Sequence, residues 1–132
     1  MVNPVDEVLR AFDDLDRATE GSDPDKIVRL FVDDPDITFW GSGISEQAVG
    51  RSALRALAKA IAGAPGSFEI EWEERRVSIR DDVAWVNARG TARWVQEGGD
   101  VRVLPYRLTA ILLREADEWL WHTVNGSEPQ PD

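Results

Sequence analysis

Residues 68–73, Phe-Glu-Ile-Glu-Trp-Glu, decide how the second half of this chain folds. Apolar and acidic residues alternate here with a period of two, which is typical of a β-strand with one buried face. Beyond Glu74 the apolar positions move to Val77 and Ile79, so the alternation changes phase. We expect a β-bulge near Arg75, because one extra residue accounts for the phase change and bends the sheet.

The rest of the second half follows the same strand pattern. Short runs of Asp, Gly and Ala that favour turns interrupt it at residues 81–82, 97–100 and 116–117. The turns separate three further predicted strands, at residues 83–95, 101–114 and 118–125.

The first half has an apolar period close to 3.6, which indicates helices. Pro4 opens a helix that ends at Gly21, Pro24 opens a second that stops at residues 33–35, and residues 51–62 form a third. A short strand at 37–40 lies between the last two. The sequence therefore predicts one α+β domain over residues 1–132, with a curved antiparallel sheet covered by three N-terminal helices.

The predicted strand at 101–113 is apolar on both faces, with Leu104 and Leu108 on one and Val103 and Ile111 on the other. Helices can cover only one of these faces. We expect the other to pack against a second copy of the chain, which predicts a homodimer through the sheet.

Composition excludes several classes of function. The chain has 25 acidic and 15 basic residues and a net charge of −10, which disfavours nucleic acid as a partner. It has no cysteine and one histidine, so thiol chemistry is excluded, and we expect neither a metal site nor a cofactor. No apolar run is long enough to cross a bilayer and no secretory signal opens the chain, so we expect a cytoplasmic protein without membrane contact.

Short motifs appear in a recognisable order along the chain. They are residues 30–37 before the first strand, 49–54 at the third helix, and 107–109, 113–115, Trp119 and 125–127 near the end. In this order they resemble the nuclear transport factor 2-like superfamily, especially its SnoaL-like, ketosteroid-isomerase-like branch. The ending is also similar to the association domain of calcium/calmodulin-dependent kinases, but Thr123 and Asn125 stand where that domain commonly has histidines.

The resemblance implies a cone-shaped domain whose sheet and helices enclose a pocket. Members of the superfamily include isomerases, dehydratases, cyclases, hydrolases and non-catalytic binding modules, so the fold does not give the function. Aligned with the isomerases, the chain has Leu15 in place of the catalytic tyrosine and Phe39 in place of the carboxylate base. Neither side chain can exchange a proton.

Other acid–base chemistries have equally few candidates. Scytalone-dehydratase-like chemistry needs several histidines, and only His122 is present. Epoxide-hydrolase-like chemistry needs an arginine between carboxylates, and Arg89 has no acidic neighbour in sequence. Asp33, Asp34 and Asp36 could act as a base only if one of them faces inward, and as helix-ending residues they are more simply exposed.

A ligand pocket remains the leading hypothesis. Asn87 and Arg89 share one strand face, and an arginine in a partly dry cavity would pair with an anion. Trp40, Tyr106 and His122 could complete an aromatic wall with polar groups, giving a predicted ligand-binding set of Trp40, Asn87, Arg89, Tyr106 and His122. Ordinary sheet positions for these residues stay possible. Two functions follow: a small-molecule-binding domain, or an enzyme acting on a small hydrophobic metabolite by acid–base chemistry.

Overall fold

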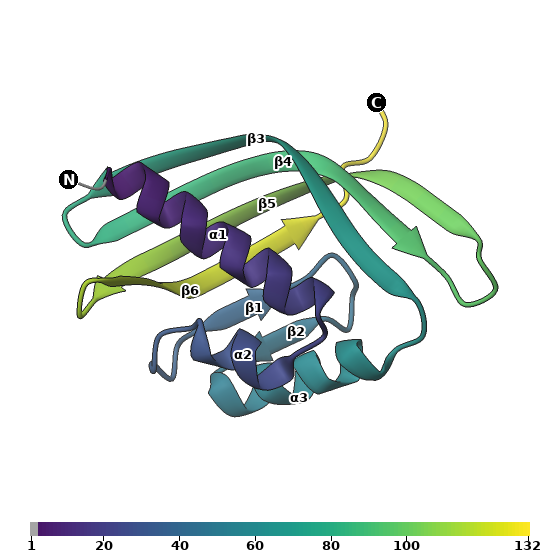
Figure 1. The fold of residues 1–132 in the computed structure, drawn as a ribbon, viewed down its shortest axis with the longest axis horizontal. Coiled ribbons are helices and arrows are strands. Elements are labelled where there is room, and N and C mark those ends of the chain that lie inside the picture. The colour runs from purple at the N-terminus through teal and green to yellow at the C-terminus, as the bar shows by residue number, and fades with distance from the viewer. Residues whose placement is uncertain (1–2) are drawn as a thin grey trace.

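The computed structural model describes residues 3–132 and places the helices on one side of a strongly curved sheet (Figure 1). The helices are α1 (Pro4–Glu20), α2 (Pro24–Arg29) and α3 (Arg51–Gly63). The strands are β1 (Thr38–Trp40), β2 (Gln47–Val49), β3 (Ser67–Arg80), β4 (Val83–Val95), β5 (Val101–Glu115) and β6 (Glu118–Ser127). The prediction of an α+β fold with N-terminal helices over a curved sheet is confirmed.

Side-chain caps fix where the first two helices begin. Asn3 Oδ1 accepts a hydrogen bond from the Val5 backbone N–H at 2.9 Å, and Pro4 occupies the first turn of α1. Asp23 Oδ1 caps α2 in the same way, because it accepts a hydrogen bond from the Lys26 backbone N–H at 3.1 Å. The capped α1 then runs across the sheet and buries its apolar stripe there (Figure 1).

The sheet has the strand order β2-β1-β6-β5-β4-β3. The four long strands pair antiparallel, as predicted, and the short strand β1 joins them through a parallel pairing with β6 that was not predicted. Strand β2, which pairs with β1, was also not predicted, since three residues are too few to display a period. Alternation identifies strands but says little about which strands become neighbours.

The bulge predicted near Arg75 is present two residues earlier in β3. The register with β4 slips between Trp72 and Glu74, which makes Glu73 the extra residue. Gly90 of β4 pairs with Trp72 at this point, and a Cβ atom there would lie 2.2 Å from the Glu71 carbonyl oxygen. The bulge therefore requires glycine at position 90.

A second bulge, which the sequence did not predict, lies in β6. The pairing of β5 with β6 slips between Ile111 and Leu112, which leaves His122 as the extra residue. Trp119 and Trp121 precede this point on the buried face, and Val124 follows it there. The bulge thus shifts the inward-facing positions of β6 from odd-numbered residues before it to even-numbered residues after it.

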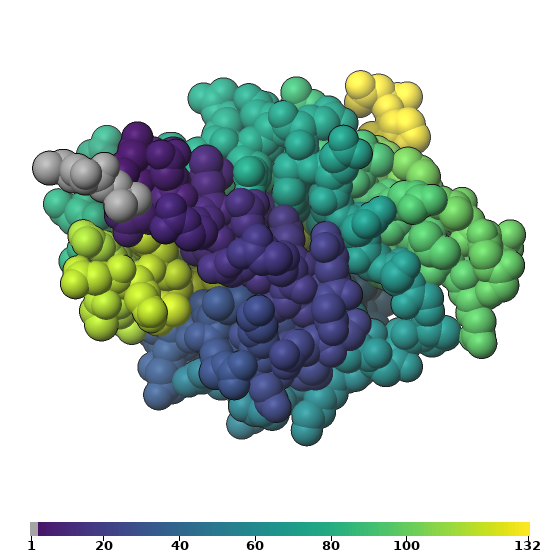
Figure 2. All heavy atoms as spheres, in the orientation of Figure 1, coloured from purple at the N-terminus to yellow at the C-terminus, as the bar shows by residue number. Residues whose placement is uncertain are grey.

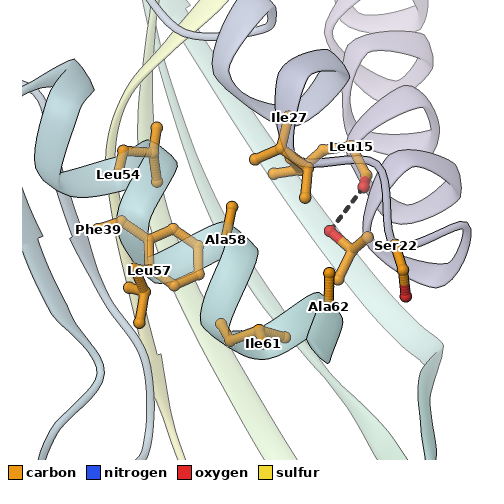
Figure 3. Close-up of a pocket in the computed structure, with 10 residues that line it drawn as sticks. Leu15, Ser22, Ile27, Phe39, Leu54, Leu57, Ala58, Ile61 and Ala62 are labelled. Atoms are coloured by element: carbon orange, nitrogen blue, oxygen red, sulfur yellow. Dashed lines mark hydrogen bonds between the residues drawn. The ribbon is translucent and has the colours of Figure 1, made fainter. Parts of the chain in front are cut away.

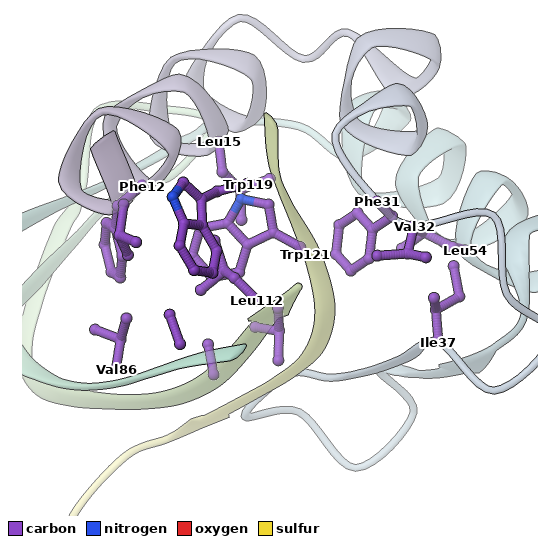
Figure 4. Close-up of a cluster of buried hydrophobic side chains, with 14 of the residues drawn as sticks. Phe12, Leu15, Phe31, Val32, Ile37, Leu54, Val86, Leu112, Trp119 and Trp121 are labelled. Atoms are coloured by element: carbon purple, nitrogen blue, oxygen red, sulfur yellow. The ribbon is translucent and has the colours of Figure 1, made fainter. Parts of the chain in front are cut away.

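The hydrophobic core lies between α1 and the inner face of the sheet (Figure 4). Phe12 lies at its centre, with its ring 5.1 Å from Trp72 and 5.4 Å from Trp121. In the space-filling view the N-terminal half covers the middle of the sheet, and the hairpin joining β4 and β5 projects beyond it (Figure 2). Within residues 3–132, none of the helices combines the length and apolar character that a bilayer-spanning helix requires.

Candidate ligand pocket

An apolar pocket lies between α1, α2, α3 and β1 (Figure 3). Its cavity volume is only about 40 Å³, well below the about 300–1,000 Å³ of typical small-ligand pockets, so a bound molecule would have to displace lining side chains. The lining residues are Leu15, Thr19, Ser22, Ile27, Phe39, Leu54, Leu57, Ala58, Ile61 and Ala62.

The chemistry of this lining is almost entirely hydrocarbon. Thr19 and Ser22 supply the only polar side-chain groups. The Thr19 hydroxyl already donates to the Leu15 carbonyl oxygen at 2.8 Å, so its proton is engaged within α1. No lining side chain titrates near neutral pH, and the pocket itself therefore offers neither a general base nor a general acid.

Leu15 and Phe39 both face this pocket (Figure 3). They come from α1 and β1, elements far apart in the sequence. These are the positions that the resemblance matches to the catalytic tyrosine and carboxylate of the isomerases. The structure thus brings the two positions together and fills both with apolar side chains.

Arg89 and Asn87 do not face the interior, so their predicted inward orientation is wrong. The inner face of β4 is made by Ala84, Val86 and Ala88, which leaves the odd-numbered residues outside. The Arg89 side chain is 58% exposed and donates to Glu73 at 2.9 Å and to Glu74 at 3.2 Å. The small side chains on one face of β4 leave space for the helices to pack there. This packing decides which face of β4 points inward, and the larger polar residues are left on the outer face.

The other predicted site residues are dispersed. Trp40 is 45% exposed at the end of β1. Tyr106 is buried on the inner face of β5, and burial raises the pKa of its hydroxyl to about 12, which keeps it neutral. The five residues are therefore not assembled into one interior wall, although Arg89 and Tyr106 both border an open surface groove of about 410 Å³ with Val103, Pro105 and Arg107.

His122 lies at the β6 bulge and faces the loop after α2. Its Nε2 atom is 3.8 Å from Asp34 Oδ2, and its Nδ1 atom is 2.7 Å from the Thr123 hydroxyl. Asp34 also accepts a hydrogen bond from the Asp36 backbone N–H at 2.7 Å, as expected for an Asx turn. Neither His122 nor Asp34 lines the apolar pocket.

One titratable residue that the sequence reasoning missed lies next to the pocket wall. Asp16 Oδ2 accepts a hydrogen bond from the Trp72 indole N–H at 2.8 Å. Burial raises the pKa of this carboxyl to about 6, with smaller contributions from Glu20 and Asp13, while Trp72 and Arg75 oppose the rise. A signal existed in the sequence, because Asp16 follows Phe12 by four residues, beside the apolar stripe of α1.

Metal binding receives no support from the described part of the chain. Among residues 3–132, no three His, Asp or Glu side chains come close enough together to hold an ion. The contacts of Asp34 and His122 remain a pair rather than a coordination sphere.

A comparison with protein families identifies the fold's relatives. Residues 8–129 match the model of the SnoaL-like domain. This chain belongs to the SnoaL-like family. No curated protein sequence is significantly similar to this SnoaL-like chain.

Comparison with solved structures also finds proteins with a similar fold. A proposed dehydratase of the NTF2-like family from Streptomyces avermitilis is similar with a TM-score of 0.88 and 16% identity, over 96% of this chain and 97% of that one. A proposed calcium/calmodulin-dependent protein kinase II association domain from Xanthomonas campestris has a TM-score of 0.80 and 20% identity, over 100% and 95%. A proposed scytalone dehydratase from Novosphingobium aromaticivorans has a TM-score of 0.79 and 12% identity, over 97% and 89%. At these identities the likeness concerns the fold of this SnoaL-like domain and not its chemistry.

Proposed function

We propose that this SnoaL-like domain binds a small, mainly apolar molecule in the pocket between α1, α2, α3 and β1, without acid–base catalysis in that pocket. One observation carries the proposal: the ten lining residues contain two hydroxyls and no titratable side chain. Proton transfer needs a group whose pKa lies near the working pH, whereas apolar binding needs only a matching hydrocarbon surface.

The apolar area that a small ligand can bury limits its affinity for the pocket. A ligand that buries about 200 Å² of apolar surface gains about 5 kcal/mol from its removal from water. Loss of translational and rotational freedom offsets part of that gain, so we expect a dissociation constant no lower than about 0.2 mM.

A neutral fluorophore tests the proposal. N-phenyl-1-naphthylamine is uncharged at neutral pH and emits strongly only in an apolar environment, so binding should raise its fluorescence saturably. Ala62→Phe fills the rim of the pocket and should abolish the saturable signal. Ala60→Phe adds the same ring at an exposed position of α3 and should leave the signal unchanged. No saturable signal with the wild type, or equal signals with Ala62→Phe and the wild type, would contradict the proposal.

The alternative, an acid–base enzyme acting on a small hydrophobic metabolite, has one observation in its favour. Asp16 lies one residue from the lining residue Leu15, and its pKa of about 6 suits general acid–base work. Its carboxylate is, however, hydrogen-bonded to Trp72 of β3 rather than exposed in the pocket. The binding function therefore explains more of the geometry.

We also propose that the outer sheet face pairs with a second copy of this chain. Val103 is 60% exposed on β5 and Ile111 is 38% exposed on the same face. On the same face, Arg89 and Arg93 of β4 pair with Glu73 and Glu69 of β3, and Arg107 lies on β5 beside Arg89. The face therefore carries charges of both signs, which a two-fold axis can place opposite one another.

Light scattering after gel filtration tests the assembly. The wild type should have about twice the chain mass of 14.8 kDa at micromolar concentration. Val103→Arg should shift it toward a single chain, because the substitution places a charge in the apolar patch. Ile44→Arg, at a fully exposed turn position between β1 and β2, should not. A wild type with the mass of one chain would contradict the dimer.

A further inference from the structure

The two ends of α3 differ in how firmly they are held. Near the start of the helix, Arg51 Nη2 donates a hydrogen bond to the Val28 carbonyl oxygen of α2 at 3.2 Å, and Arg51 Nη1 lies 3.6 Å from Asp33 Oδ1. One turn later, Arg55 forms an ion pair with Asp25 of α2. These contacts fasten the first half of α3 to α2 and to the loop that follows α2.

The second half of α3 has no such contacts. Among the residues that the structure describes, no side-chain hydrogen bond or ion pair involves residues 56–66. Burial of the large apolar side chains falls in the same direction, because Leu54 is 3% exposed and Ile61, two turns later, is 39% exposed. Sparse apolar packing without polar contacts is typical of a segment that opens locally at low cost.

The connection from α3 to β3 confines this freedom to the end of the helix. A Cβ atom at Gly63 would meet no other atom within 4 Å, so the last residue of α3 has open space around it. Ala64 is extended, as expected for the residue before Pro65, and the helix cannot continue. A Cβ atom at Gly66 would lie 2.3 Å from the Val95 carbonyl oxygen, so the chain is closely packed again where β3 begins.

The loosely held end of α3 also closes the apolar pocket. Ile61 and Ala62 line the pocket on its solvent side, together with Thr19 and Ser22 around the end of α1 (Figure 3). Because the cavity volume is only about 40 Å³, a ligand enters only if part of this lining moves.

The opposite wall, α1, is held more firmly than the end of α3. Asp16 Oδ2 accepts a hydrogen bond from the Trp72 indole N–H at 2.8 Å, and Asp13 Oδ1 accepts one from Arg75 Nη1 at 2.6 Å. Two side chains of β3 thus fasten α1 to the sheet. Of the two helices that face each other across the pocket, α3 therefore moves at the lower cost.

We propose that residues 61–63, at the end of α3, are the gate of the apolar pocket: they move away from α1 to admit a ligand, and Ile61 then packs against it. The inference rests on the proposed binding function and names how that site is reached. The first half of α3, fastened to α2, stays in place as the pivot. Gate movements of this kind occur on the microsecond-to-millisecond timescale.

Methyl relaxation dispersion tests the movement in the ligand-free protein. The methyl groups of Ile61 and Leu57 should show microsecond-to-millisecond exchange, whereas those of Leu54 and Ile37, which are buried, should show none. Benzyl alcohol, a neutral aromatic that dissolves at millimolar concentrations, should suppress the exchange at Ile61, because a bound ligand favours one arrangement of the gate. No exchange at Ile61, or equal exchange at all four residues, would overturn the proposal.

A reversible cross-link tests whether the gate controls entry. The chain has no cysteine, so Ser22→Cys combined with Ala62→Cys places a single pair of thiols on the two sides of the pocket opening. Oxidation to the disulfide should abolish exchange at Ile61 and raise the dissociation constant of benzyl alcohol by about tenfold or more, because the open arrangement is no longer populated. Reduction should restore both, and the reduced protein is the matched control.

The outcomes separate the gate from the binding function. If benzyl alcohol binds with equal affinity to the oxidised and reduced proteins, the gate is refuted and the binding function stands. If exchange is present at Ile61 but neither protein binds benzyl alcohol, the binding function is refuted and the gate with it. The relaxation measurement on the wild type decides whether residues 61–63 move, whatever the yield of the disulfide.

Discussion

Arg89 Nη1 lies 2.9 Å from Glu73 Oε2 on the outer face of the sheet. Glu73 is the extra residue of the β3 bulge, and the bulge also brings Glu74 to 3.2 Å from Arg89 Nε. Two carboxylates of β3 thus pair with the Arg89 guanidinium. No external anion is needed to neutralise this guanidinium.

The Arg89 pairs should contribute little to stability and nothing to ligand binding. Arg89→Met should lower the free energy of unfolding by at most about 1 kcal/mol, because exposed ion pairs are screened by water. Urea denaturation measures this change. Benzoate should not alter the melting temperature of either protein, and a rise in the wild type that Arg89→Met removes would restore Arg89 as an anion-binding residue.

Asp16 should make stability depend on pH in a defined window. Its pKa rises from an ordinary value of 3.8 to about 6 on folding, so the folded state holds this proton more tightly than the unfolded state. The stabilisation from this group is complete below about pH 4 and is lost as pH rises through 6. Asp16→Asn avoids the loss and should be more stable than the wild type above pH 6, by about 1–2 kcal/mol after allowance for solvent screening.

Denaturant titrations of both proteins at several pH values check this prediction. The difference between the two should be small near pH 4, grow toward pH 6 and then remain constant. A variant that is less stable than the wild type at pH 7 would show that the ionised carboxylate, hydrogen-bonded to Trp72, favours the fold.

Steroid isomerisation should be absent. Leu15 and Phe39 face the pocket at the positions that carry the tyrosine and the carboxylate in the isomerases that the chain resembles. Without a proton-exchanging group there, a 3-oxo-Δ5 steroid should show no increase in conjugated-enone absorbance over a heat-inactivated control. Turnover that survives repurification would mean that another residue acts as the base.

The β3 bulge should depend on a glycine in β4. Gly90→Ala places a methyl group 2.2 Å from the Glu71 carbonyl oxygen, so strands β3 and β4 must separate locally, and we expect a loss of about 2–4 kcal/mol in unfolding free energy. Gly63→Ala, at the end of α3, meets no atom within 4 Å and should be neutral or stabilising by up to about 1 kcal/mol. Equal stabilities of the two variants in thermal denaturation would contradict the close approach.

The sequence predicted the elements well because their signals are local. The alternation at residues 68–73 and the helical stripe through Val8 and Phe12 both reflect burial on one face. The structure has a half-buried strand and an amphipathic helix at these positions. Strand β2 escaped prediction because its three residues cannot display a period. The parallel pairing of β1 with β6 depends on contacts between distant segments, which periodicity does not encode.

The candidate site was harder to predict for a physical reason. A ligand pocket was expected to contain polar groups, which directed attention to Arg89 and His122. The pocket is instead lined by Leu54, Leu57 and Ile61, and in sequence these residues cannot be distinguished from ordinary core. The space arises where α3, packed against α2, faces α1 across the pocket.

We propose that a small molecule binds in the apolar pocket, and intermolecular NOEs provide a direct test of this binding. With methyl-labelled protein and N-phenyl-1-naphthylamine, we predict NOEs from the ligand's aromatic protons to the methyl groups of Leu54, Leu57 and Ile61, which line the pocket. The methyl groups of Val103, on the outer sheet face, should give none. NOEs to Val103 alone, or no intermolecular NOE at a saturating ligand concentration, would contradict the account.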